Sequence, residues 1–225
     1  MGELRTPKGA ILDCDGTLLD SMGAWRELES MLASAAGTEL SPDHTDVLSK
    51  LTIPEEAAFF HKTFGLGRNP DAVVGMIDDF MTAYYHERAL ERPGAVAFVE
   101  RLVAAGVRCA VVSSSPQRYL RAGLAKIGLE GMVRAVLSVD DVGMSKRDPR
   151  IYLTALGTMD VSAGDGWGID DSIYAIRSMN TAGLFTIGLH DRDDSGTFEE
   201  LQGEANIAAR SFEELEKTVP LFACC

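Results

Sequence analysis

The first apolar run of the chain is short and ends in acidic residues and glycine. Gly9-Ala10-Ile11-Leu12 is followed at once by Asp13-Cys14-Asp15-Gly16-Thr17. A brief apolar run bounded by turn residues is typical of a buried strand. Because polar turns after buried strands are the usual place for chemistry in α/β proteins, the pattern predicts a strand that leads into a candidate site.

From Met22 to about Leu90 the spacing of apolar residues changes to that of helices. Trp25, Leu28, Met31 and Leu32 recur three and four positions apart, which places them on one helix face. Glycine and proline interrupt this pattern at Gly37, Pro42, Pro54, Gly65-Leu66-Gly67 and Pro70. We therefore expect a block of about four helices with no strand.

After Arg92-Pro93-Gly94 the pattern alternates between helix and strand. Strands are predicted at 107–112, 135–138, 166–169 and 184–187, and more weakly at 206–208. Repeated strand-helix units indicate an α/β fold with a doubly wound parallel sheet. The helical block then reads as an insertion, so we expect a discontinuous core domain of residues 1–17 and 93–225 and a helical cap domain of residues 18–92.

The net charge limits the classes of binding partner, and the cysteines indicate the cell compartment. A formal net charge of −13 argues against binding to nucleic acid or to anionic membranes, because both require clustered Lys and Arg. A phosphate ester would therefore need a local metal ion and a fixed lysine. Four cysteines without metal-site or disulfide spacing, and no apolar run of eighteen residues, predict a cytoplasmic protein. We expect a monomer.

Polar side chains follow several of the predicted strands, at the edge where parallel strands bind ligands. They are Asp13 and Asp15, Ser113, Lys146, and the pair Asp170-Asp171. A carboxylate can attack phosphorus, Mg²⁺ prefers oxygen ligands, and a lysine and a hydroxyl can neutralise and orient phosphoryl oxygens. Ser115 and Pro116 read instead as the start of a helix, with Ser115 as the cap.

The motif Asp13-Cys14-Asp15-Gly16-Thr17-Leu18-Leu19-Asp20-Ser21, in order with Ser113, Lys146 and Asp170-Asp171, resembles the haloacid dehalogenase superfamily. The resemblance covers essentially the whole chain and points to the branch with a helical cap after the first motif, which includes β-phosphoglucomutase and phosphoglycolate phosphatase. It implies that Asp13 is the nucleophile and that Asp15 is the general acid and base. Both carboxyl groups can face one phosphoryl group, since they lie two residues apart on an extended segment.

The resemblance also implies a Mg²⁺ cofactor and a set of binding residues. Mg²⁺ would bind the side chains of Asp13 and Asp171 and the backbone carbonyl of Asp15, with Asp170 close by or linked through water. The phosphoryl group would be held by the turn and strand-end residues Gly16, Thr17, Ser113, Ser114 and Lys146. Glycine at position 16 would let backbone N–H groups approach the phosphate.

Two segments depart from the expected pattern. Arg147 follows Lys146 where the family usually has proline, which leaves the path of that loop open. Gly164, Gly166 and Gly168 flank Trp167 where a buried strand would carry larger apolar residues. We expect another element to pack closely against this strand.

The sequence thus predicts a Mg²⁺-dependent phosphatase that hydrolyses a small phosphate ester through an aspartyl phosphate. A phosphosugar mutase of the β-phosphoglucomutase type would share the same core residues. Asp15 argues against dehalogenation, whose halide leaving group needs no acid. A phosphonate hydrolase would need a cap lysine, for which Lys50 and Lys62 are available, and a receiver-like signalling protein is an alternative of another class.

Substrate identity would reside in the insertion. Its candidate polar contacts are Arg26, Lys50, Thr52 and Lys62, whereas Trp25 reads more simply as a packing residue.

Overall fold

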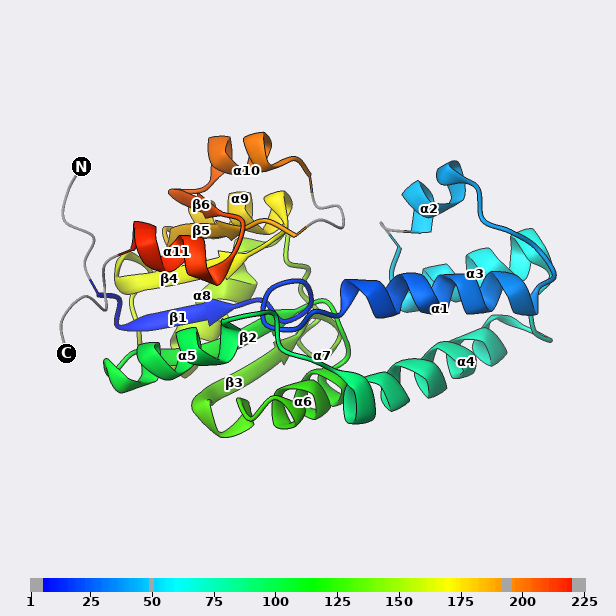
Figure 1. Ribbon diagram of the computed structural model, residues 1–225, viewed down its shortest axis with the longest axis horizontal. Helices are drawn as coiled ribbons and strands as arrows, with labels where there is room; N and C mark the ends of the chain where they lie inside the picture. Colours follow the sequence, from blue (N-terminus) through cyan, green and yellow to red (C-terminus); the bar gives the residue numbers. More distant parts are fainter. Residues whose placement is uncertain (1–5, 49–50, 192–195, 220–225) are drawn as a thin grey trace. The chain divides into compact units, whose positions relative to one another are not determined.

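The computed structural model describes residues 6–48, 51–191 and 196–219. Its described chain forms a six-stranded sheet in the order β3-β2-β1-β4-β5-β6, with every pair parallel (Figure 1). The strands are β1 (Gly9–Leu12), β2 (Arg108–Ser113), β3 (Val133–Ser138), β4 (Gly166–Asp170), β5 (Phe185–Leu189) and β6 (Ile207–Ala209). The predicted strands and the doubly wound sheet are confirmed.

Helices cover both faces of this sheet (Figure 1). One layer packs over a core that includes Ile11, Ile151 and Met179. It consists of α8 (Pro149–Thr158), α9 (Ile173–Ala182) and α10 (Phe198–Glu204). The other comprises α5 (Ala95–Ala104), α6 (Gln117–Lys126) and α11 (Phe212–Thr218), with a ring contact between Phe98 and Phe212 at 5.1 Å. The short elements are η2 (Glu130–Met132), α7 (Val139–Val142) and η3 (Ala163–Asp165).

The central strand β1 is buried on both faces, which explains its unbroken apolar run. Its neighbours are β2 and β4, and Leu12 lies opposite Ile169 of β4. From β1 the chain first adds β2 and β3 on one side of the sheet, and it then adds β4, β5 and β6 on the other side. The order of strands therefore reverses between β1 and β4, and their carboxyl ends form a topological switch point. Such a point is where open α/β sheets bind ligands.

The glycines of β4 let two helices approach the strand closely, which confirms the predicted close packing. A Cβ on Gly166 would lie 2.9 Å from Leu156 Cδ2 of α8, and a Cβ on Gly168 would lie 2.2 Å from Met179 Sδ of α9. Both distances are too short for a carbon atom to fit without movement. Gly164 lies in η3 before the strand, and an added Cβ there would meet nothing within 4 Å.

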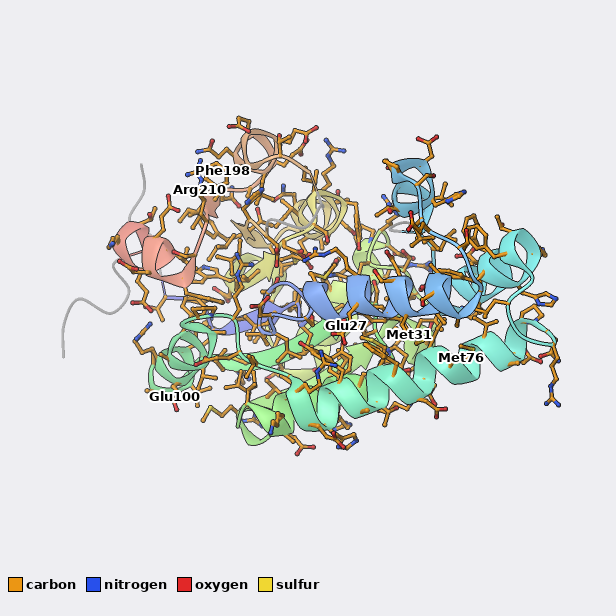
Figure 2. The ribbon with its side chains drawn as sticks, turned by 45° about the vertical axis from the view of Figure 1, so that its right-hand side comes forward. Glu27, Met31, Met76, Glu100, Phe198 and Arg210 are labelled. Carbon is orange, nitrogen blue, oxygen red and sulfur yellow. The ribbon has the colours of Figure 1, made fainter. Side chains whose placement is uncertain are left out.

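Residues Ser21–Arg88 form a second compact unit. Its elements are α1 (Met22–Ala35), α2 (Pro42–Leu48), α3 (Ile53–Phe64), α4 (Pro70–Ala83) and the π-helix η1 (Tyr84–Arg88). Leu28, Phe60 and Ile77 are among the side chains fully buried in it. Glu27 lies on the side of α1 toward α4 (Figure 2) and pairs with Arg88 of η1.

The other compact unit holds Met1–Asp20 and Ala89–Cys225. Two segments of this unit lead into and out of residues Ser21–Arg88, and these linking segments pair with each other. Arg92 N–H donates to Leu18 O at 2.9 Å, and Asp20 N–H donates to Leu90 O at 3.1 Å. Leu18 and Leu19, which are fully buried, belong to this unit and not to the helical one. In the described ranges, no helix combines the length and the apolar character needed to cross a membrane.

Candidate active site

Three buried carboxylates converge at the carboxyl ends of β1 and β4. The register that pairs Leu12 with Ile169 brings Asp13 beside Asp170, and Asp13 N–H donates to Ile169 O at 2.9 Å. One carboxylate oxygen from each of Asp13, Asp170 and Asp171 lies within 4.8 Å of the others. The strand pairing therefore gathers acids from opposite halves of the sheet unit.

Lys146 supplies the cation of this site. Its Nζ lies 2.9 Å from Asp13 Oδ1 and 2.6 Å from Asp170 Oδ2. The Lys146 side chain is 4% exposed, so both ion pairs are shielded from water. One ammonium among three carboxylates leaves the cluster with excess negative charge, which is costly in a buried setting.

The pKa shifts of Asp13 and Lys146 reflect burial first and the neighbouring charges second. Burial raises the pKa of Asp13 well above its ordinary value, Lys146 opposes the rise, and Asp170 and Asp171 add to it. Burial alone would lower the pKa of Lys146, but Asp13 and Asp170 more than offset this and raise it. The lysine is therefore charged, and a further cation would stabilise the carboxylates. A hard divalent ion with oxygen ligands, such as Mg²⁺, fits this donor set.

The Asp15 carboxyl group is bound to a serine hydroxyl. Ser115 Oγ donates to Asp15 Oδ2 at 2.6 Å, and Ser115 N–H donates to Ser113 Oγ at 3.1 Å. The expectation that Ser115 caps the next helix is wrong, because the N-cap residue of α6 is Pro116 and the Ser115 hydroxyl turns to the acid. Ser113 is buried at the end of β2, and Ser114 is exposed.

Gly16 and Thr17 form the turn after the acidic pair. Gly16 has a φ of +79°, and an added Cβ would lie 2.7 Å from Asp171 Oδ2. Glycine is therefore required here by the left-handed backbone and by the neighbouring carboxylate. The Gly16 N–H donates to Leu19 O at 2.9 Å. Thr17 is fully buried, and its Oγ1 has no hydrogen-bond partner within the described chain.

Hydrogen bonds hold the loop that carries Lys146, in which Arg147 stands at the position expected for proline. The hydroxyl of Tyr152 donates to Lys146 O at 3.0 Å, and Arg147 N–H donates to Ser145 Oγ at 3.1 Å. Asp148 caps α8 through Arg150 N–H. No sequence pattern predicted the Tyr152 contact, and its only signal is a tyrosine one helical turn into α8.

Arg92 is a second residue whose role was not predicted. Its guanidinium donates to the backbone carbonyls of Gly16 and His190, and at 3.3 Å to those of Leu189 and Arg210. These carbonyls lie at the end of β5 or in the segments that follow β1, β5 and β6. The Arg92 side chain therefore connects the turn at Gly16 to the ends of β5 and β6. Burial lowers the pKa of Arg92, whereas Asp191, Asp171 and Asp20 oppose that change.

The candidate contacts of the helical unit differ in their surroundings. Thr52 is engaged locally, since its N–H and its hydroxyl donate to Glu55 Oε2 at 2.9 and 2.7 Å at the start of α3. Arg26 and Lys62 are exposed, and Trp25 is half-buried. Lys50 lies outside the described residues.

Comparison with known proteins shows the family of this chain. The model of the haloacid dehalogenase-like hydrolases matches residues 7–183. The chain belongs to this family. The recognition from the Asp13–Thr17 motif is confirmed, and the chain is an enzyme of the hydrolase class.

Individual relatives and a solved structure agree with this assignment. Validoxylamine A 7'-phosphate phosphatase of Streptomyces hygroscopicus subsp. limoneus is 26% identical over 210 residues, which cover 92% of this chain and 95% of that protein. Phosphoglycolate phosphatase of Rhodospirillum rubrum is 28% identical over 189 residues, 79% of this chain and 77% of that protein. The crystal structure of β-phosphoglucomutase from Clostridium difficile shares the fold, with a TM-score of 0.73 at 16% identity over 96% of this chain and 99% of that one.

Proposed function

We propose that this haloacid dehalogenase-like hydrolase is a Mg²⁺-dependent phosphatase that acts on a small phosphate monoester through an aspartyl phosphate on Asp13. The observation that carries the proposal is the convergence of Asp13, Asp170 and Asp171 beside the buried Lys146. A nucleophilic carboxylate, a cation for phosphoryl oxygens and a set of metal ligands are what phosphoryl transfer requires.

In the first step a carboxylate oxygen of Asp13 forms a bond to phosphorus while the bond from phosphorus to the ester oxygen breaks. Asp15 gives its proton to the departing oxygen, which leaves as an alcohol. In the second step water attacks phosphorus, its proton passes to Asp15, and the bond between Asp13 and phosphorus breaks. Inorganic phosphate is released, and both aspartates return to their starting states.

The remaining side chains hold and orient the reacting groups. Lys146, Ser113 and Ser114 would contact phosphoryl oxygens, together with the turn at Gly16 and Thr17. Asp13, Asp171 and the backbone carbonyl of Asp15 would hold Mg²⁺, with Asp170 positioned by Lys146. When bound, the ion would neutralise charge on the phosphoryl oxygens. The helical unit would act as a cap domain and select the substrate.

Phosphate release from a panel of esters, with and without Mg²⁺, tests the proposal. The panel contains phosphoglycolate, validoxylamine A 7'-phosphate and N-acetylmuramic acid 6-phosphate, because relatives of this chain are named for them. Asp13→Asn should abolish release, and Asp79→Asn, which removes an exposed carboxylate of α4, should not. Release that continues without Mg²⁺ or in Asp13→Asn would contradict the mechanism.

The same experiment separates the mutase and signalling alternatives. A phosphosugar mutase would need a bisphosphate primer and would keep phosphate in its product. A receiver-like protein would form an aspartyl phosphate that survives for minutes in the presence of Mg²⁺. Steady release of inorganic phosphate excludes both outcomes.

A further inference from the structure

The hydroxyl of Ser115 serves the general acid rather than the helix that follows it. It donates to Asp15 Oδ2 at 2.6 Å across a sequence separation of 100 residues. Ser115 is 7% exposed and Asp15 is half-buried, so this contact is partly shielded from water.

One hydrogen bond and the following proline restrict Ser115 itself. Its N–H donates to Ser113 Oγ at 3.1 Å, which closes a small turn at the end of β2. Pro116 follows at the N-cap of α6 and restricts the backbone on the other side. The Ser115 hydroxyl therefore comes from a rigid part of the chain, as a group that orients another must.

We infer that Ser115 is a positioning residue for Asp15, because its hydroxyl holds the carboxyl group in one orientation toward the reacting ester oxygen. A carboxyl group held in one orientation presents its acidic oxygen to the same point each time. This inference rests on the proposed role of Asp15 in protonating the departing oxygen.

Loss of the Ser115 hydroxyl should affect esters according to their leaving group, whereas loss of a purely structural serine would slow all esters alike. An alkyl phosphate must lose a strongly basic alkoxide, so its reaction depends on a well-placed acid. A p-nitrophenyl ester loses a weakly basic phenolate that needs little protonation. Removal of the Ser115 hydroxyl should therefore slow the alkyl ester selectively.

The experiment compares kcat/KM for an alkyl ester and p-nitrophenyl phosphate, because kcat/KM reports the steps up to the first phosphoryl transfer. For Ser115→Ala we expect a loss of roughly tenfold or more with the alkyl ester and at most about twofold with the aryl ester. Asp15→Asn should show the same selectivity more strongly. Ser115→Thr, which retains a hydroxyl, should restore part of the loss.

Ser178→Ala is the matched control, since it removes a buried hydroxyl of α9 that lacks a partner within the described residues. Equal losses for both esters in Ser115→Ala, or no loss, would overturn the inference. If Asp15→Asn still loses more kcat/KM with the alkyl ester than with the aryl ester while Ser115→Ala does not, the proposed function stands. If the wild type hydrolyses none of the esters, both the inference and the proposed function are overturned. Thermal unfolding of each variant identifies losses that arise from misfolding.

Discussion

The hydroxyl of Tyr152 donates a 3.0 Å hydrogen bond to the backbone carbonyl of Lys146. Both residues are buried, and they lie in the loop and first helical turn that bring the lysine to Asp13. The phenol is the partner of a carbonyl that would otherwise be buried without one. It fixes the start of the lysine side chain where the family usually has a proline.

Tyr152→Phe should therefore weaken both the fold and the site. The change keeps the ring but leaves the Lys146 carbonyl without its donor, which should reduce the free energy of unfolding by about 1–2 kcal/mol. We also expect a lower kcat/KM, because Lys146 is then held less firmly. Urea unfolding and phosphate release measure the two effects. Unchanged values for both would show that another group or water replaces the phenol.

Mg²⁺ should stabilise the folded protein through the Asp13, Asp170 and Asp171 cluster. Binding to the folded state alone adds about 2.7 kcal/mol at an ion concentration one hundred times the Kd. Asp171→Asn removes a proposed ligand and should abolish most of the Mg²⁺-dependent rise in Tm. The exposed Asp79→Asn serves as the control. A similar rise in both variants would place the ion elsewhere.

The strands and their polar ends could be predicted because both depend on local pattern. A short apolar run followed by acids indicated β1 and Asp13, and the same reasoning indicated β4 and Asp170. Their contact then follows from strand order, since β1 and β4 are neighbours in this sheet. The glycines of β4 signalled close packing because only a missing Cβ admits a neighbour at that distance.

Contacts between distant side chains could not be predicted in this way. Ser115 has the local features of a helix cap, and its bond to Asp15 depends on how the ends of β1 and β2 meet. Arg92 looks like a linker residue, yet it reaches carbonyls of three strand ends. The boundaries of the helical unit fall at 20/21 and 88/89, inside the predicted range of 18–92, because the two linking segments pair with each other.

The contact of Gly168 with Met179 should show strong coupling between β4 and α9. Gly168→Ala places a carbon 2.2 Å from Met179 Sδ, which should cost about 1–3 kcal/mol. In a Met179→Ala background the added methyl group should cost much less. A double-mutant cycle measured by urea unfolding gives the coupling energy, which we expect to be about 1 kcal/mol or more. Additive effects would show that the clash is relieved elsewhere.

Glu56 should make the stability of the protein depend on pH. It lies in α3 with 5% of its surface exposed, and its Oε1 has no hydrogen-bond partner in the described part of the chain. Burial, and secondarily the carboxylate of Glu29, raise the pKa of Glu56 from 4.5 to about 8. Between these two values the folded state holds a proton that the unfolded state has released.

Stability should therefore fall as the pH rises from 4.5 to about 8, by on the order of a few kcal/mol. Below 4.5 both states are protonated, and above about 8 the loss is complete. Glu56→Gln removes this titration, so its advantage in unfolding free energy over the wild type should grow across the interval. Urea unfolding at pH 5, 6.5 and 8 measures the effect, with the exposed Glu39→Gln as the control. Parallel pH profiles for the wild type and Glu56→Gln would mean that Glu56 ionises in the folded protein as readily as in the unfolded chain.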